Sequence, residues 1–124
     1  MCNCAYEDLV LKILNLEEFR KLPAGTIFLK YEPCVFEELQ CKGDTWDHDF
    51  LSENIAYNIE NTGSDDFSGK LFDAQEYGIS LKMDFNCRSR DGCFDRDQLF
   101  AVYEKQDVEM LISKLTKCLG SAYT

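Results

Sequence analysis

The pattern that most constrains the fold is an apolar stripe near the C-terminal end of the sequence. Its members recur at the i, i+3, i+4, i+7 spacing of a helix: Val108, Leu111, Ile112, Leu115, Cys118 and Leu119. Asp107 is a good N-cap, and Lys114 and Lys117 lie late, where the helix dipole favours positive charge. An apolar face about 100° wide has to be buried against another element. The sequence therefore predicts a C-terminal helix that packs on the domain, with Leu111 and Leu115 buried.

Short aromatic and aliphatic runs elsewhere are typical of β-strands. Residues 81–86 alternate strictly between apolar and polar side chains, which is the pattern of a half-buried strand. The other predicted strands are 26–32, 35–42, 50–60 and 99–103. Charged residues interrupt 35–42, and this favours an edge strand, because edges carry charges that discourage pairing with other chains.

Two further helices are predicted from their ends. Asn15 and Glu18 have the spacing of a capping box at the start of a short helix. A second helix covers 64–77, with Gly78 in the left-handed position after its end. The fold class is therefore α+β: a mostly antiparallel sheet of four to five strands with two or three helices packed on one face.

The chain has 124 residues, which predicts a single domain, 1–124, with residues 1–5 frayed. It contains no apolar run of about 18 residues and no basic leader before an apolar stretch. We therefore expect no membrane partner and a cytoplasmic location. The net charge of −10 also disfavours direct binding to nucleic acid.

Negative charge is concentrated in one part of the sequence. Residues 32–66 contain ten acidic residues and one base, Lys42, so this segment has a net charge of −9. Because duplex DNA carries one charge per roughly 1.7 Å, nine charges match about 15 Å of duplex. The segment is thus dense enough to occupy a basic nucleic-acid channel, although a solvated surface that keeps the protein soluble is the simpler alternative.

We interpret the protein as a non-enzymatic acidic interaction protein that docks on a basic surface of a protein partner. Aromatic residues such as Trp46, Phe36 or Phe50 would anchor the complex, and complementary charge would speed encounter. The residues predicted to bind the partner are Glu32, Glu37, Glu38, Asp44, Trp46, Asp47, Asp49 and Glu53.

A small ligand-binding module is the first alternative. Arg88, Arg90 and Arg96 fall within nine residues and could bind an anionic nucleotide through bidentate hydrogen bonds. Three aspartates interleaved with them make internal pairing the stronger expectation.

A small Cys/His metalloprotein is the second alternative. None of the seven cysteines has Cys-x2-Cys spacing, so a zinc site would have to be assembled from Cys34, Cys41, Cys87, Cys93 or His48. We expect no cofactor and no metal, with Cys34, Cys87 and Cys118 as small apolar residues of the core. His48 lies between two aspartates, which favour the imidazolium, a poor general base, and this argues against an enzyme.

Two stretches resemble small acidic proteins of bacteriophages and prophages. They are Leu22-Pro23-Ala24-Gly25-Thr26-Ile27-Phe28 with Tyr31-Glu32-Pro33-Cys34, and Asp91-Gly92-Cys93-Phe94-Asp95-Arg96-Asp97-Gln98-Leu99-Phe100-Ala101-Val102-Tyr103. The resemblance implies a setting in which short acidic proteins block host defence or nucleic-acid machinery, as anti-CRISPR and anti-restriction proteins do. It implies no functional residues.

Overall fold

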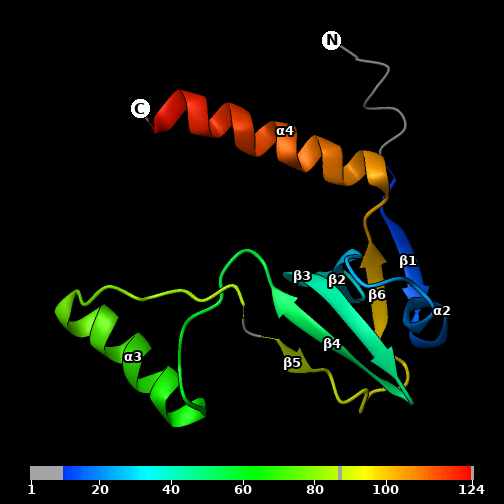
Figure 1. The fold of residues 1–124 in the computed structure, drawn as a ribbon, viewed down its shortest axis with the longest axis horizontal. Coiled ribbons are helices and arrows are strands. Elements are labelled where there is room, and N and C mark those ends of the chain that lie inside the picture. Colours follow the sequence, from blue (N-terminus) through cyan, green and yellow to red (C-terminus); the bar gives the residue numbers. More distant parts are fainter. Residues whose placement is uncertain (1–9, 87, 124) are drawn as a thin grey trace.

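The computed structural model describes residues 10–86 and 88–123, which form one antiparallel sheet of six strands and three helices (Figure 1). The strands are β1 (Lys12–Asn15), β2 (Ile27–Glu32), β3 (Val35–Trp46), β4 (Asp49–Asn54), β5 (Ser89–Arg90) and β6 (Leu99–Val102). The helices are α2 (Leu16–Arg20), α3 (Ser64–Tyr77) and α4 (Lys105–Ala122). The α+β prediction is confirmed, with one strand more than the upper expectation. The expectation for residues 1–5 lies outside the described residues.

The strand order is β1-β6-β2-β3-β4-β5, so β3 lies inside the sheet and not at its edge. This 12-residue strand pairs with β2 through its first part and with β4 from Gln40 onward. The charged residues in 35–42 predicted an edge strand, and this prediction is correct only for the first residues of β3. Residues 35–38 pair with β2 alone, and their outer side meets no other strand of the described chain.

The core is a cluster of aromatic rings beneath α2. Phe19 of α2 is fully buried, with its ring stacked on Phe100 at a centroid distance of 4.1 Å and with Phe28 and Phe50 at 4.6 and 5.1 Å. The capping box predicted at Asn15 is present, because Glu18 N donates to Asn15 Oδ1 and Asn15 N donates to Glu18 Oε1. Local capping thus starts α2, and Phe19 fixes it against the strands.

Lys42 is also part of this core, although it is charged. Its side chain is buried, and Nζ donates to Thr45 Oγ1 and to the Gly43 carbonyl at 2.5 and 3.3 Å. The ammonium lies 5.8 Å from the Phe50 ring centroid and 5.9 Å from that of Phe19. Burial lowers the pKa of Lys42, against a smaller opposing effect of Asp44. The core therefore includes a buried ammonium group that contacts two aromatic rings and two oxygen atoms. Lys42 has no ion pair with a carboxylate in the described chain.

The two long helices stand away from the sheet, contrary to the prediction that they pack on one face (Figure 1). Neither α3 nor α4 contains a buried residue. Leu111 is only half-buried and Leu115 is 60% exposed, so the prediction that Leu115 is buried is wrong.

The direction of α4 has a physical cause at its first turn. The connection from β6 is only two residues, and Val10 N donates to Asp107 Oδ1 at 3.0 Å. Lys12 forms an ion pair with Glu104 at 2.6 Å. These contacts tie the start of α4 to the chain leading into β1, so the helix points outward.

Residues 81–86 do not form a strand of the sheet, despite their strict alternation. They make one isolated bridge, between Met83 and Ile59, and Leu81, Met83 and Phe85 are exposed. Alternation sets only the side-chain period. A strand also needs a partner with the same regularity, and residues 58–60 offer only two flanking backbone hydrogen bonds. Among the residues described, no helix is both long and apolar enough to cross a bilayer.

Candidate protein-binding surface

Ion pairs divide the acidic segment 32–66 into two parts. Four acids of the later part are paired with bases that follow them in the chain: Asp49 with Arg90 at 3.0 Å, Glu53 with Arg88 at 3.9 Å, Glu60 with Lys82 at 3.5 Å, and Asp66 with Lys70 at 3.3 Å. Asp49 is 6% exposed, so its assignment as a docking residue is wrong. The Glu53 carboxylate is mostly covered and is engaged by Arg88, so it offers little to a partner.

The other six acids of this segment have no ion pair within the described chain. They are Glu32, Glu37, Glu38, Asp44, Asp47 and Asp65. The first three lie at the connected ends of β2 and β3, whereas Asp44 and Asp47 lie at the turn into β4. Along an extended strand the two groups are about 20 Å apart. The unpaired carboxylates of the β2–β3 end and of the turn into β4 therefore form two separate acidic groups.

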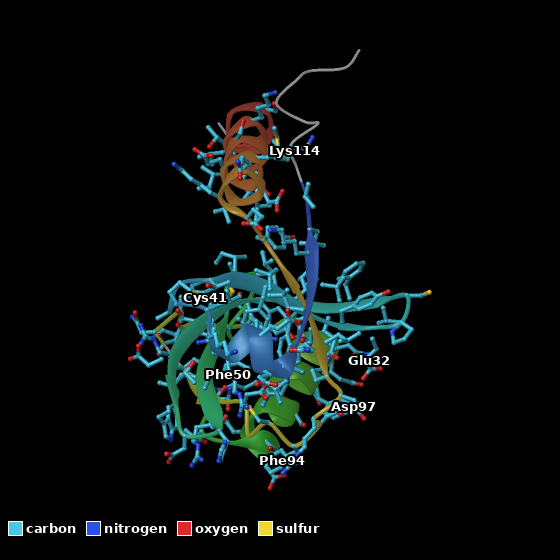
Figure 2. The ribbon with its side chains drawn as sticks, turned by 90° about the vertical axis from the view of Figure 1, so that its right-hand side faces the viewer. Glu32, Cys41, Phe50, Phe94, Asp97 and Lys114 are labelled. Carbon is cyan, nitrogen blue, oxygen red and sulfur yellow. The ribbon has the colours of Figure 1, made fainter. Side chains whose placement is uncertain are left out.

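The first group surrounds an exposed apolar end of the β2–β3 hairpin. Val35 and Phe36 are 55% and 52% exposed, and the Phe36 ring packs on Tyr31 at a centroid distance of 5.0 Å. We call this surface the acidic hairpin tip: Tyr31, Glu32, Val35, Phe36, Glu37 and Glu38. Glu32 lies at this end of the sheet, far from α4 (Figure 2). The tip combines an apolar centre, three carboxylates and an unpaired outer strand side.

The turn of the hairpin is held by its own side chains. Cys34 adopts a left-handed backbone conformation, with φ of 68°, and its N–H donates to the Tyr31 hydroxyl at 3.1 Å. Tyr57 reaches the tip from outside the hairpin, donating its hydroxyl to Glu38 Oε1 at 3.4 Å. Burial and the neighbouring Glu38 carboxylate raise the pKa of Tyr57, so this tyrosine stays a donor. The tip is thus shaped before any partner arrives.

The three predicted aromatic anchors lie in three different environments. Phe36 is exposed at the acidic hairpin tip, as an anchor requires, but Phe50 is fully buried in the core and its assignment is wrong. Trp46 is 38% exposed beside the second acidic group, and the Arg90 guanidinium lies 5.4 Å from its ring centroid.

The three arginines predicted as one cluster are separated by the fold. Arg90 binds Asp49 and Arg88 lies against Glu53, so internal pairing is correct for both, with partners other than the interleaved aspartates. Arg96 has no ion pair among the described residues. The fold thus places the three guanidinium groups in different surroundings, although they are close in the sequence.

Arg96 instead lines a hollow of about 460 Å³ next to α2. The lining residues are Leu16, Glu17, Arg20, His48, Gly92, Cys93 and Arg96. Arg20 Nη1 donates to the His48 carbonyl at 3.1 Å, which holds the β3–β4 turn against α2. Sequence reasoning missed Arg20 in this set, because nothing local links it to a residue so far along the chain. The lining of this hollow thus combines two arginines and one histidine with a single acid, Glu17.

Next to the hollow, Asp49 organises a buried hydrogen-bond network. Its Oδ1 accepts from Phe50 N and Gly92 N, both at 2.8 Å, and its Oδ2 accepts from Arg90 Nε at 3.0 Å. Although burial favours the neutral acid, these bonds hold the pKa of Asp49 below its ordinary value. Asp91 is paired with Lys30 at 2.5 Å, so both carboxylates already have cationic or N–H partners.

Cys93 completes this network through its thiol, 3.7 Å from Asp49 Oδ1. Burial, with added repulsion from Asp91 and Asp49, raises the pKa of Cys93 to about 11. Asp49, Asp91 and Cys93 are close enough to share a cation, with ligand atoms within 4.8 Å of one another. Their existing hydrogen bonds explain the grouping as part of the fold. Cys34 and Cys118 are exposed and not core residues as predicted, and Cys87 lies outside the described residues.

No protein-family model matches this chain, and neither curated proteins nor solved structures gave a match.

Proposed function

We propose that the protein is a non-enzymatic interaction protein that docks its acidic hairpin tip on a basic surface of another protein. The observation that supports this most is the composition of the tip. Val35 and Phe36 are half exposed, and the three carboxylates around them have no ion pair within the described chain. Four other acids of the 32–66 segment, Asp49, Glu53, Glu60 and Asp66, are instead ion-paired within the chain.

This combination has the features of a protein interface. An apolar centre supplies affinity when it is desolvated, and a charged rim supplies orientation and speed of encounter. The outer side of residues 35–38 adds free backbone groups that can pair with an extended segment of the partner. Exposed carboxylates cost little to bring near cations, whereas Asp49 would first have to break its internal bonds.

A nucleic-acid-binding protein is the kind of partner that the charge arrangement favours. Two acidic groups about 20 Å apart fit a basic surface that is extended in one direction, and a nucleic-acid groove has that form. The mimicry is partial, because duplex DNA carries about twelve charges over that length and these two groups supply five. The resemblance to phage proteins supports an inhibitor of host defence, of the anti-CRISPR or anti-restriction type.

The proposal is tested by a capture experiment in which the wild-type protein and two double variants of equal charge are used as baits for a partner protein. Glu37→Lys with Glu38→Lys alters the acidic hairpin tip, and Asp73→Lys with Glu76→Lys alters exposed acids of α3. Both double variants change the net charge by the same amount. We expect a partner captured by the wild-type protein to be lost with the first variant and kept with the second. Equal loss with both would show that only overall charge matters and would overturn the proposal.

A second candidate function is binding of a small anion, and the hollow beside α2 favours it. Arg20, His48 and Arg96 converge there from three different segments, and its volume lies within the range of ligand pockets. Calorimetric titration with ATP and with GMP tests this. Arg96→Ala should weaken binding, whereas Arg88→Ala, outside the hollow, should leave it unchanged. Absence of binding heat for both nucleotides would remove nucleotides from consideration.

A further inference from the structure

We propose that the protein forms a dimer in which α4 packs against α4 of a second copy. The helix presents an apolar stripe that nothing in the described chain covers: Ile112, Leu115 and Leu119 are 58%, 60% and 61% exposed. Together with Val108 they recur at alternating intervals of four and three residues, the spacing of a seam between two helices. The stripe runs along most of an 18-residue helix, a length of about 27 Å.

The helix is held in a position from which it does not cover its own sheet. The Val10–Asp107 hydrogen bond and the Lys12–Glu104 ion pair fix its first turn, and only two residues separate it from β6. Lys114 of α4 lies well away from the sheet and from Phe50 in its core (Figure 2). The described part of the chain therefore does not supply the occupant of the stripe.

The exposed area agrees with one missing interface. The chain exposes 9127 Å², whereas a folded monomer of 14.3 kDa exposes about 6,800 Å². The residues outside the described part can be subtracted from both areas, with each counted at the full area of an unfolded residue in the area of the chain. The described part then still exposes roughly 900 Å² more than a folded monomer of its size. A standard interface buries about 800 Å² on each partner, so the excess, to which α3 also contributes, is of the size of one interface.

Charge favours a second copy that uses this same helix. Residues 105–122 contain three lysines and two acids, so α4 is slightly basic in a chain with a net charge of −10. Two such chains repel least when they meet through α4, with their acidic hairpin tips turned away. An interface of α4 on α4 is also isologous, and it closes as a two-fold dimer without leaving a further sticky surface.

The test is the mass of the particle in solution, measured by sedimentation equilibrium on the full chain. At about 100 µM chain a dimer with micromolar Kd is almost fully associated. We expect the wild-type protein to have twice the single-chain mass. Leu115→Asp should return the mass to that of one chain, and Ser113→Asp, which adds the same charge on the opposite side of the helix, should leave the dimer intact.

Two measurements keep the result decisive. Far-UV circular dichroism shows whether Leu115→Asp still folds, and Leu119→Asp, one turn further from the sheet, is the replacement variant if it does not. A wild-type mass of one chain at this concentration would overturn the proposal. So would folded Leu115→Asp or Leu119→Asp protein that dimerises as well as Ser113→Asp.

Discussion

Substitution of Phe19 by alanine tests whether the aromatic cluster holds the domain together. The side chain is fully buried and its ring contacts three other rings, at 4.1, 4.6 and 5.1 Å. Removing a buried phenylalanine costs about 3–5 kcal/mol from lost transfer free energy and the cavity that remains. We expect the upper part of this range, because each aromatic pair adds roughly 0.5–1.5 kcal/mol beyond area burial.

The consequence is large for so small a core. Natural domains have a free energy of unfolding of only about 5–15 kcal/mol, so Phe19→Ala should remove about a quarter or more of it. Urea unfolding followed by tryptophan fluorescence measures the change, since Trp46 lies at the end of β3. Phe36→Ala is the control, because that ring is 52% exposed and its loss should cost less than about 1 kcal/mol. Equal midpoints for the two variants would refute this account of the core.

Two further predictions concern buried titratable groups. Burial lowers the pKa of Lys42 below 10.5, so between the folded-state pKa and 10.5 the unfolded chain binds more protons and wild-type stability rises with pH. Lys42→Met has no titrating group at this position, so its stability lacks this increase. The free energy of unfolding of the variant, minus that of wild type, should therefore fall as pH rises toward 10.5. A difference that does not change with pH would contradict a lowered pKa of Lys42. Cys93, with its pKa raised from 9.0 to about 11, should have about 100-fold less thiolate than an ordinary thiol at neutral pH. Peptide mapping after iodoacetamide treatment at pH 8 should therefore find Cys34 modified well before Cys93, and equal rates would contradict a partly buried, protonated thiol.

Features set by neighbouring residues were predictable from the sequence. The capping box at Asn15, the strand at 26–32 and the helix at 64–77 with Gly78 after it all depend on a few adjacent side chains, and the structure confirms them. The amphipathic pattern of 107–119 likewise predicted a helix correctly. What it did not contain is the direction of that helix, because the Val10–Asp107 and Lys12–Glu104 contacts join distant parts of the chain.

The candidate surface shows the same limit. The count of acidic residues in 32–66 is a property of the sequence, but which of them remain available depends on Lys70, Lys82, Arg88 and Arg90, whose positions are set by tertiary folding. Phe50 and Phe36 look alike as aromatic residues in an acidic segment, yet one is in the core and the other at the hairpin end. The difference between these two phenylalanines depends on where each lies in the paired strands, which the sequence pattern does not specify.

The most direct test of the proposed function is the salt dependence of the association rate with the captured partner, compared between the two charge-matched double variants. For wild type and for Asp73→Lys with Glu76→Lys, we expect association to slow steeply between about 50 and 200 mM salt, because screening shortens the reach of the acidic hairpin tip. Glu37→Lys with Glu38→Lys should associate more slowly at low salt and respond much less to added salt. If the two double variants instead associate at the same rate and with the same salt dependence, the acidic hairpin tip does not guide binding and the proposed function is wrong.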